Sequence, residues 1–194
     1  MSVSLFWTPY AGPGRIGIAT RPRGGDWLKD DIKYLHNAGT DVLVSMLTPE
    51  ESRELQLEME EKLCKDEGMN YQCIPIQDRD VPSTIKNVAV FALRLSKFLE
   101  NGSNIIVHCR QGIGRSAMMV ALVLVTCGME VDLAFGMIEK ARGRPVPDTE
   151  EQRTWVEQYA VGLQLMDVLK VSEKVEQYKK VHDATKEQIE NETY

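Results

Sequence analysis

The feature that most constrains this chain of 194 residues is a short loop set between two apolar runs. The first run is Asn104–Val107, the second is Ala117–Val125, and the loop between them carries two glycines. This order of apolar run, tight glycine-bearing loop and longer apolar run predicts a buried strand, a turn and a buried helix. A loop in that position points its backbone N–H groups inward at the positive end of a helix, so it predicts an anion-binding cradle.

The loop itself combines a cysteine, an arginine and a serine at fixed spacing in the order His108-Cys109-Arg110-Gln111-Gly112-Ile113-Gly114-Arg115-Ser116. We expect Gly112 and Gly114 to provide positive φ values and close backbone approach. The planar fork of Arg115 can hold two phosphate oxygens, which a lysine cannot do. The inward N–H groups, the helix terminus and Arg115 should together lower the pKa of Cys109 well below the free value of about 8.5. The pattern therefore predicts a thiolate nucleophile aimed at phosphorus.

The remaining loop residues have predicted supporting roles. Ser116 is expected to donate a hydrogen bond to the thiolate, and later to the sulfur as a leaving group. His108 is expected to orient the loop through hydrogen bonds. The phosphate-binding residues are expected to be Arg110, Gln111, Gly112, Ile113, Gly114 and Arg115.

Other loops and sites fit the spacing less well. A nucleotide-binding loop needs Gly-x-x-x-x-Gly-Lys-Ser/Thr, but Arg115 precedes Ser116 and the first glycine of that frame is missing. A sulfur-transfer loop of the rhodanese type usually has four residues between Cys and Arg, and this loop has five. Zinc is disfavoured because the chain has no Cys-x-x-Cys pair, and His36 and His182 have no partners at metal-ligand spacing. A cysteine that merely packs in the core would not explain Gly-x-Gly-Arg-Ser.

This loop resembles the signature of the cysteine-dependent protein tyrosine phosphatase superfamily, His-Cys-x5-Arg-Ser/Thr. The chain looks most similar to the compact dual-specificity or atypical branch, which includes the kinase-associated phosphatases. It lacks a loop resembling the phosphotyrosine clamp of the large receptor-type enzymes. The resemblance covers about residues 40 to 160.

Two further segments support the resemblance. Pro75–Pro82 is similar to the mobile family loop that carries a general acid four residues before a proline, which implies Asp78, with Asp80 in reserve. Pro147–Gln152 resembles the segment whose glutamine positions the hydrolytic water in some relatives, which implies a catalytic role for Gln152.

Alternating apolar patterns predict an α/β fold, with a central, mainly parallel sheet flanked by helices and the Cys-x5-Arg loop between a strand and a helix. We expect strands at Ile16–Ala19, Val42–Met46, Tyr71–Ile76 and Ile105–His108. We expect helices after Asp26, from the capping box at Thr48 to Gly68, from Ser83 to Leu99, and over Val131–Ala141 and Thr149–Tyr159. Cys109 and Asp78 both follow strands, so one cleft can hold both.

Residues 1–160 are expected to form a phosphatase domain and residues 161–194 an amphipathic helical extension, either docked on the domain or paired in a coiled coil. A formal net charge of −6 argues against a nucleic-acid partner. The chain has four cysteines without a disulfide framework, no apparent signal peptide and no apolar run long enough to span a membrane. These features predict a cytoplasmic protein with no membrane partner.

The expected function is metal-independent hydrolysis of a phosphorylated protein through a phosphocysteine, with no cofactor. Phosphotyrosine is the favoured substrate, and dual specificity for phosphoserine and phosphothreonine remains open. The alternatives are a phosphoinositide or RNA 5′-phosphate phosphatase and an inactive phosphate-binding module. Two further hypotheses are an arginine rim for an anionic substrate and a protective disulfide between Cys109 and either Cys73 or Cys64; the rim arginines are Arg15, Arg21, Arg23, Arg79 and Arg110.

Overall fold

The computed structural model describes residues 3–166 of the chain. The chain divides into two compact units, Met1–Tyr159 and Ala160–Tyr194, and the fold described below is that of the first unit. Most of the expected C-terminal extension, residues 167–194, lies outside the described residues, so the choice between a docked helix and a coiled coil stays a prediction.

A five-stranded sheet forms the centre of the first unit, with the strand order β1-β2-β5-β3-β4. The strands are β1 Leu5–Thr8, β2 Ile16–Ala19, β3 Val42–Ser45, β4 Asn70–Cys73 and β5 Ile105–His108. Strands β2, β5, β3 and β4 are parallel to one another, and only the edge strand β1 runs antiparallel to its neighbour β2. The predicted mainly parallel sheet is thus confirmed, while β1 was not predicted.

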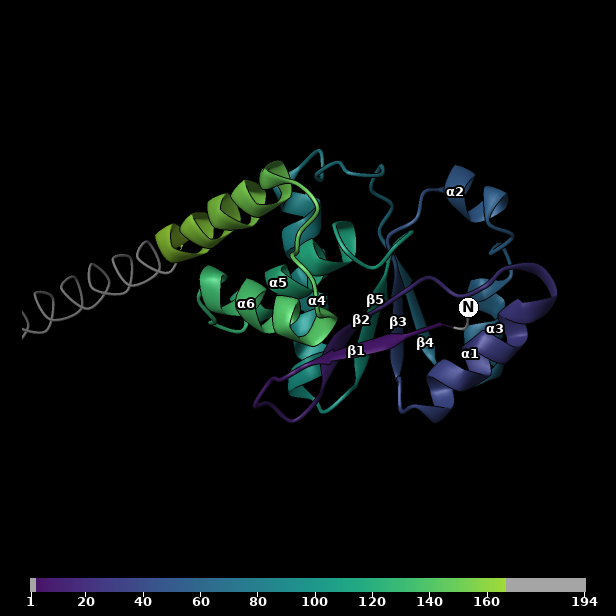
Figure 1. The fold of residues 1–194 in the computed structure, drawn as a ribbon. Coiled ribbons are helices and arrows are strands. Elements are labelled where there is room, and N and C mark those ends of the chain that lie inside the picture. The colour runs from purple at the N-terminus through teal and green to yellow at the C-terminus, as the bar shows by residue number, and fades with distance from the viewer. Residues whose placement is uncertain (1–2, 167–194) are drawn as a thin grey trace, which may run out of the picture. The chain divides into compact units, whose positions relative to one another are not determined.

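Helices cover both faces of this sheet (Figure 1). Helices α1 and α3 lie on one face, and α4, α5 and α6 lie on the other. The chain forms the 3-10 helix η1 Gly25–Trp27, then α1 Leu28–Asn37, α2 Pro49–Glu54, α3 Glu60–Asp66, α4 Ile85–Glu100, α5 Arg115–Thr126 and α6 Val131–Arg142. A further helical segment begins at residue 150.

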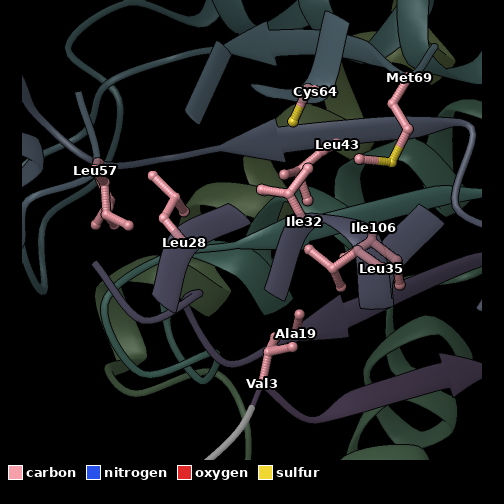
Figure 2. Close-up of a cluster of buried hydrophobic side chains, with 11 residues drawn as sticks. Val3, Ala19, Leu28, Ile32, Leu35, Leu43, Leu57, Cys64, Met69 and Ile106 are labelled. Atoms are coloured by element: carbon pink, nitrogen blue, oxygen red, sulfur yellow. The ribbon is translucent and has the colours of Figure 1, made fainter. Parts of the chain in front are cut away.

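Apolar side chains fill both interfaces between helices and sheet. Leu28, Ile32 and Leu35 of α1 pack in one cluster with Leu43 of β3 and Ile106 of β5 (Figure 2). Successive side chains of a strand point to opposite faces of the sheet. The buried residues next to Leu43 and Ile106 in the sequence therefore face the helices on the other side of the sheet. There α5 is buried on all sides from residue 115 to residue 125, as expected of a helix that is apolar all round.

Three predicted helix boundaries are wrong: two concern α1, α2 and α3, and the third is the start of α4. The helix expected from Thr48 to Gly68 is two helices, α2 and α3, because the chain turns at Gln56, whose φ of +56° lies in the left-handed region, and buries Leu57. The first helix starts at Leu28, after a 3-10 turn that contains Asp26.

The predicted start of the long helix on the other face also needs correction. Helix α4 begins at Ile85 with Thr84 as its N-cap, not with Ser83, and no side chain caps it. Ile85, the first residue of α4, is 47% exposed. The predicted capping box at Thr48 is present, with hydrogen bonds in both directions between Thr48 and Glu51.

Candidate active site

The register of the sheet gathers the site at one edge. Ala19, His108, Ser45 and Cys73 are aligned across the four parallel strands and are the last residues of these strands. The segments that follow all four strands therefore leave the sheet at the same edge, as expected for ligand sites in parallel sheets. The Cys109 loop leaves from β5 and the Asp78 loop from β4.

Cys109 lies at the base of the loop with 3% of its surface exposed. Its Sγ is 3.5 Å from Oγ of Ser116. Burial alone would raise the pKa of Cys109, but the Ser116 hydroxyl and the backbone N–H groups of Ser116, Ile113 and Gln111 outweigh it, so the pKa is lowered. The loop thus favours the thiolate by hydrogen bonding.

The two loop glycines are needed for different reasons. Gly112 has a φ of +66°, and a Cβ there would collide with the carbonyl oxygen of Ala19 on β2. Gly114 has a φ of −80°, so the expected positive φ is absent at this position. A Cβ at Gly114 would instead lie 2.8 Å from Oε1 of Gln152, so this position requires glycine for close packing.

Arg115 is buried and held by a carboxylate that the sequence did not single out. Its Nη1 and Nη2 donate to the two carboxylate oxygens of Glu51 at 2.7 and 2.8 Å, and Nη1 also donates to the Ile76 carbonyl at 2.6 Å. Burial alone would raise the pKa of Glu51, but hydrogen bonds from Arg115 and from the Thr48 amide outweigh it and lower the pKa. The buried Nε of Arg115 has no partner among the described residues, so one donor of the fork remains for an anion.

Of the two candidate acids, only Asp78 reaches the Cys109 loop with its side chain. Its Oδ1 accepts a hydrogen bond from Nη2 of Arg115 at 2.7 Å, and the side chain is 55% exposed. Oδ1 of Asp80 instead accepts from the backbone N–H of Val81 at 2.7 Å. Arg79, between the two acids, has a φ of +62°, in the left-handed region.

Gln152 connects the acid loop to the nucleophile loop. It is fully buried, its Nε2 donates to the backbone carbonyl of Asp80 at 3.2 Å, and its side chain lies against Gly114. Its Oε1 is buried without a partner in the described part of the chain. Thr149 caps the helical segment that contains Gln152, because its hydroxyl accepts a hydrogen bond from the Gln152 amide at 3.3 Å.

His108 forms a buried ion pair beneath the loop. Its Nε2 lies 3.0 Å from Oε1 of Glu60, which the sequence had not indicated as a partner, and the contact lacks the alignment of a hydrogen bond. The other carboxylate oxygen of Glu60 accepts from the Tyr71 hydroxyl at 3.2 Å. Burial alone would lower the pKa of His108, but the negative charge of Glu60 outweighs it and raises the pKa.

A third unpredicted residue, Arg142 at the end of α6, holds the loop from outside. Its Nε donates to the carbonyl of Gly112 at 2.7 Å and its Nη2 to the carbonyl of Gln111 at 3.3 Å. The guanidinium also lies over the ring of Phe6, 4.2 Å from the ring centre. With these carbonyls held outward, the peptide N–H groups of the loop are free to face the sulfur.

The two cysteines considered as disulfide partners of Cys109, Cys73 and Cys64, lie on different elements of the fold. Cys73 is on β4, which is separated from β5 by one strand, so the two backbones are roughly 9.5 Å apart. A disulfide needs Cα atoms within about 7 Å, so a bond from Cys73 would require backbone movement. Cys64 is buried in α3, and burial raises its pKa.

Among the described residues, no group of three or more His, Cys, Asp or Glu side chains is arranged to hold a metal ion.

Solved phosphatase structures share this fold. Kinase associated phosphatase matches with a TM-score of 0.76 and 18% identity, covering 84% of this chain and 97% of its own. PTPMT1, solved in complex with PI(5)P, matches with a TM-score of 0.67 and 20% identity, covering 83% and 99%. A single-residue variant of human DUSP28 matches with a TM-score of 0.60 and 18% identity, covering 82% and 97%. The fold is that of the compact dual-specificity phosphatases.

Sequence comparison gives the family. Mouse laforin is 36% identical over 59 residues, which is 30% of this chain and only 18% of laforin. Residues 16–129, more than half of the chain, match the family model described as "Polymorphic toxin system, DSP-PTPase phosphatase". The chain therefore belongs to this family of cysteine-dependent, dual-specificity-type protein phosphatases, as the signature loop indicated. Cys109, Arg115 and Asp78 lie inside the matched segment, whereas Gln152 lies beyond it.

Proposed function

We propose that this protein hydrolyses protein phosphotyrosine through a phosphocysteine at Cys109, without a metal ion. One observation carries the proposal: a buried thiol whose pKa is lowered shares a loop with a buried arginine that keeps an Nε–H without a partner among the described residues. A thiolate beside free N–H donors suits attack on a dianionic phosphate ester, because the donors stabilise the equatorial oxygens of the transition state.

In the first step, Cys109 attacks phosphorus in line with the departing oxygen. The S–P bond forms as the P–O bond breaks, and the loop N–H groups and Nε of Arg115 bind the three equatorial oxygens. Asp78 donates its proton to the leaving oxygen, and its 2.7 Å contact with the Arg115 guanidinium supports its position beside the Cys109 loop. The products are a free hydroxyl and a phosphocysteine.

In the second step, water attacks the phosphocysteine. Asp78, now a carboxylate, takes one proton of the water, and Oε1 of Gln152 accepts the other hydrogen in a hydrogen bond. The burial of that oxygen without a partner among the described residues supports this role. The S–P bond breaks, Ser116 donates its hydroxyl proton in a hydrogen bond to the returning thiolate, and inorganic phosphate leaves.

Phosphotyrosine on a protein is the favoured substrate, with phosphoserine and phosphothreonine as the dual-specificity extension. Gln111 and Ile113 put no charge inside the loop, whereas phosphoinositide and RNA-directed relatives often carry lysines there. The structural likeness to PTPMT1, solved with PI(5)P, supports a phosphoinositide as the second candidate. A reduced Cys109 also requires a reducing compartment, which supports the cytoplasm as the place of action.

The test is turnover of a phosphotyrosine peptide by the purified protein in EDTA. We expect release of phosphate that is blocked by vanadate and by iodoacetate, and that is abolished in Cys109→Ser. Cys109→Ser should still bind the peptide, because the cradle remains. Dependence on an added metal, or appreciable turnover by Cys109→Ser, would remove Cys109 as the nucleophile.

A further inference from the structure

Beneath the Cys109 loop, a buried ion pair connects α3 to the strand that carries the nucleophile. Glu60 is the first residue of α3, and His108 is the last residue of β5. The side chains of His108 and Glu60 are 0% and 2% exposed. A carboxylate removed from water in this way needs a partner that balances its charge. Among the residues that the structure describes, His108 is the one cation in contact with Glu60.

The other polar groups around this ion pair are neutral. Tyr71 of β4 donates its hydroxyl to the second carboxylate oxygen of Glu60 at 3.2 Å. Burial and the charge of Glu60 raise the pKa of the Tyr71 hydroxyl. Desolvation and the same charge raise the pKa of the Cys64 and Cys73 thiols, on α3 and β4. These three groups therefore stay protonated near pH 7, and Glu60 is balanced only when His108 holds a proton.

The proton on His108 bears on the reaction because the next residue is Cys109. Burial alone would lower the pKa of His108, but the negative charges of Glu60 and of the Cys109 thiolate raise it. The attraction between two charges acts on both of them, so an imidazolium at His108 also favours the thiolate. Acting directly, the like charge of Glu60 would oppose the thiolate, so its route through His108 gives an effect of opposite sign.

We propose that Glu60 is a positioning residue for the nucleophile: it keeps His108 as an imidazolium, and the imidazolium holds Cys109 as a thiolate. This inference rests on the proposed function, because it explains how the proposed nucleophile is charged before a substrate arrives. Glu60 comes from α3 and its supporting Tyr71 from β4, so neither residue is specified by the Cys-x5-Arg-Ser pattern.

The proton on His108 can be observed in protein whose site is unchanged. The chain has three histidines, so ring-¹³C-labelled histidine gives three NMR signals. His36→Gln and His182→Gln assign the other two signals without touching the site. We expect the His108 signal to remain that of an imidazolium at pH 7, where an ordinary histidine with a pKa of about 6.5 is mostly neutral. A neutral His108 ring at pH 7 would overturn the inference.

Substitution of Glu60 tests the link to the nucleophile. Glu60→Gln keeps the size of the side chain and removes its charge, so His108 should be neutral at pH 7. The midpoint of the pH profile for inactivation by iodoacetate should then move to higher pH. At a pH below both midpoints, inactivation should be about tenfold slower, as expected when one nearby opposite charge is lost. A midpoint that moves to lower pH would show that the carboxylate acts on Cys109 directly, which contradicts the proposal.

The pH profile of kcat/KM gives a second reading of the same variant. Its acidic limb, which depends on the thiolate, should move to higher pH in Glu60→Gln. Its alkaline limb, which we assign to Asp78, should stay in place. A uniform loss of kcat/KM at every pH, with both limbs unmoved, would indicate a structural role alone.

Glu61→Gln is the matched control for the loss of one charge from α3. Glu61 is the next residue, and its exposed carboxylate pairs with Lys65 at 2.6 Å. This variant should change neither the iodoacetate midpoint nor the His108 signal. A shift in Glu61→Gln as large as that in Glu60→Gln would mean that any negative charge on α3 has the same effect, and would exclude a specific role for Glu60.

The double variant Glu60→Gln, His108→Gln tests the route through the imidazole, and it replaces the buried charges by two neutral amides. If Glu60 acts through His108, the double variant should have the same iodoacetate midpoint as Glu60→Gln. A midpoint well above that of Glu60→Gln would show that His108 keeps its charge without Glu60, which overturns the inference.

Failure of this inference differs from failure of the proposed function. The NMR and iodoacetate measurements use the resting protein and need no substrate. The proposed function fails if wild-type protein does not turn over the phosphotyrosine peptide, even though its thiol midpoint depends on Glu60. The inference fails if the enzyme is active and Glu60→Gln leaves that midpoint unchanged.

Discussion

At the scale of single residues, the charge state of Cys109 depends on hydrogen bonds that oppose its burial. The largest of these is from the Ser116 hydroxyl, 3.5 Å from the sulfur. The thiolate form is available above the lowered pKa of Cys109 and disappears as the pH falls through it. Reactivity of this thiol should therefore extend to lower pH than that of an ordinary cysteine.

Ser116→Ala should raise the pKa of Cys109, because it removes the strongest stabilising hydrogen bond while the burial remains. The midpoint of the pH profile for inactivation by iodoacetate should move to higher pH, and phosphocysteine breakdown should slow. Ser96→Ala is the control, since Ser96 is a buried serine on α4 whose hydroxyl donates only to the Leu93 carbonyl. An unchanged midpoint in Ser116→Ala would mean that the backbone N–H groups alone stabilise the thiolate.

Asp78 and Asp80 make different contacts, and kinetic measurements should show which of them acts as the general acid. Asp78→Asn should remove the alkaline limb of the pH profile of kcat/KM, because that limb reports loss of the acid's proton. It should slow phenyl phosphate more than nitrophenyl phosphate, whose leaving group needs less protonation. Asp80→Asn, whose side chain bonds the Val81 amide, should retain the limb. The reverse pattern would assign the acid to Asp80.

Arg115→Lys should lower kcat by about a hundredfold or more, because an ammonium cannot hold both oxygens of Glu51 and also offer the donor that Nε of Arg115 keeps for a phosphate oxygen. Stopped-flow or steady-state assays on one aryl phosphate would measure the loss. A lysine variant with nearly normal kcat would rule out the phosphate-binding role that we assign to Nε of Arg115.

At the scale of elements, α2 links the end of β3 to the nucleophile loop through one side chain. Glu51 closes the capping box of α2 with Thr48 and also holds both Nη atoms of Arg115. The start of α2 and the position of the Arg115 side chain therefore depend on the same buried carboxylate. Breaking such a pair leaves a buried charge uncompensated, which is costly.

Glu51→Gln should lower the free energy of unfolding at pH 7 by about 3 kcal/mol. Because the pKa of Glu51 is lowered in the folded state, its contribution is present above the unfolded value of about 4.3 and is lost as the pH falls through the folded value. The difference between wild type and variant in urea unfolding should thus shrink in acid. Glu50→Gln, at an exposed neighbour, should change stability by less than about 0.5 kcal/mol. Equal effects of the two variants would contradict this account of Glu51.

At the scale of the whole molecule, patterns within one short segment could be read from the sequence, whereas contacts between residues far apart in the chain could not. The strand–loop–helix around Cys109 was predictable because it is a short segment with its own pattern. The side chain of Asp78 lies at that loop, and its role as the acid stays a prediction. Glu51, Glu60 and Arg142 come from other segments, and only the fold brings them to the loop. Strand β1 was missed because Leu5–Thr8 is only four residues long and shows no alternation of apolar and polar residues. Of the five arginines expected to form a rim, Arg21, Arg23 and Arg110 line one cavity together with Arg144, which was not expected, whereas Arg15 and Arg79 do not line it.

The most direct measurement of the central claim is capture of the covalent intermediate. Wild-type protein in EDTA is mixed with a phosphotyrosine peptide, quenched by denaturant within milliseconds, and analysed by peptide mass spectrometry. We predict one phosphoryl group on the peptide that contains Cys109, more of it in Ser116→Ala, and none in Cys109→Ser. Turnover of the substrate with no phosphoryl group on Cys109 at any quench time, in wild type and in Ser116→Ala alike, would contradict the account.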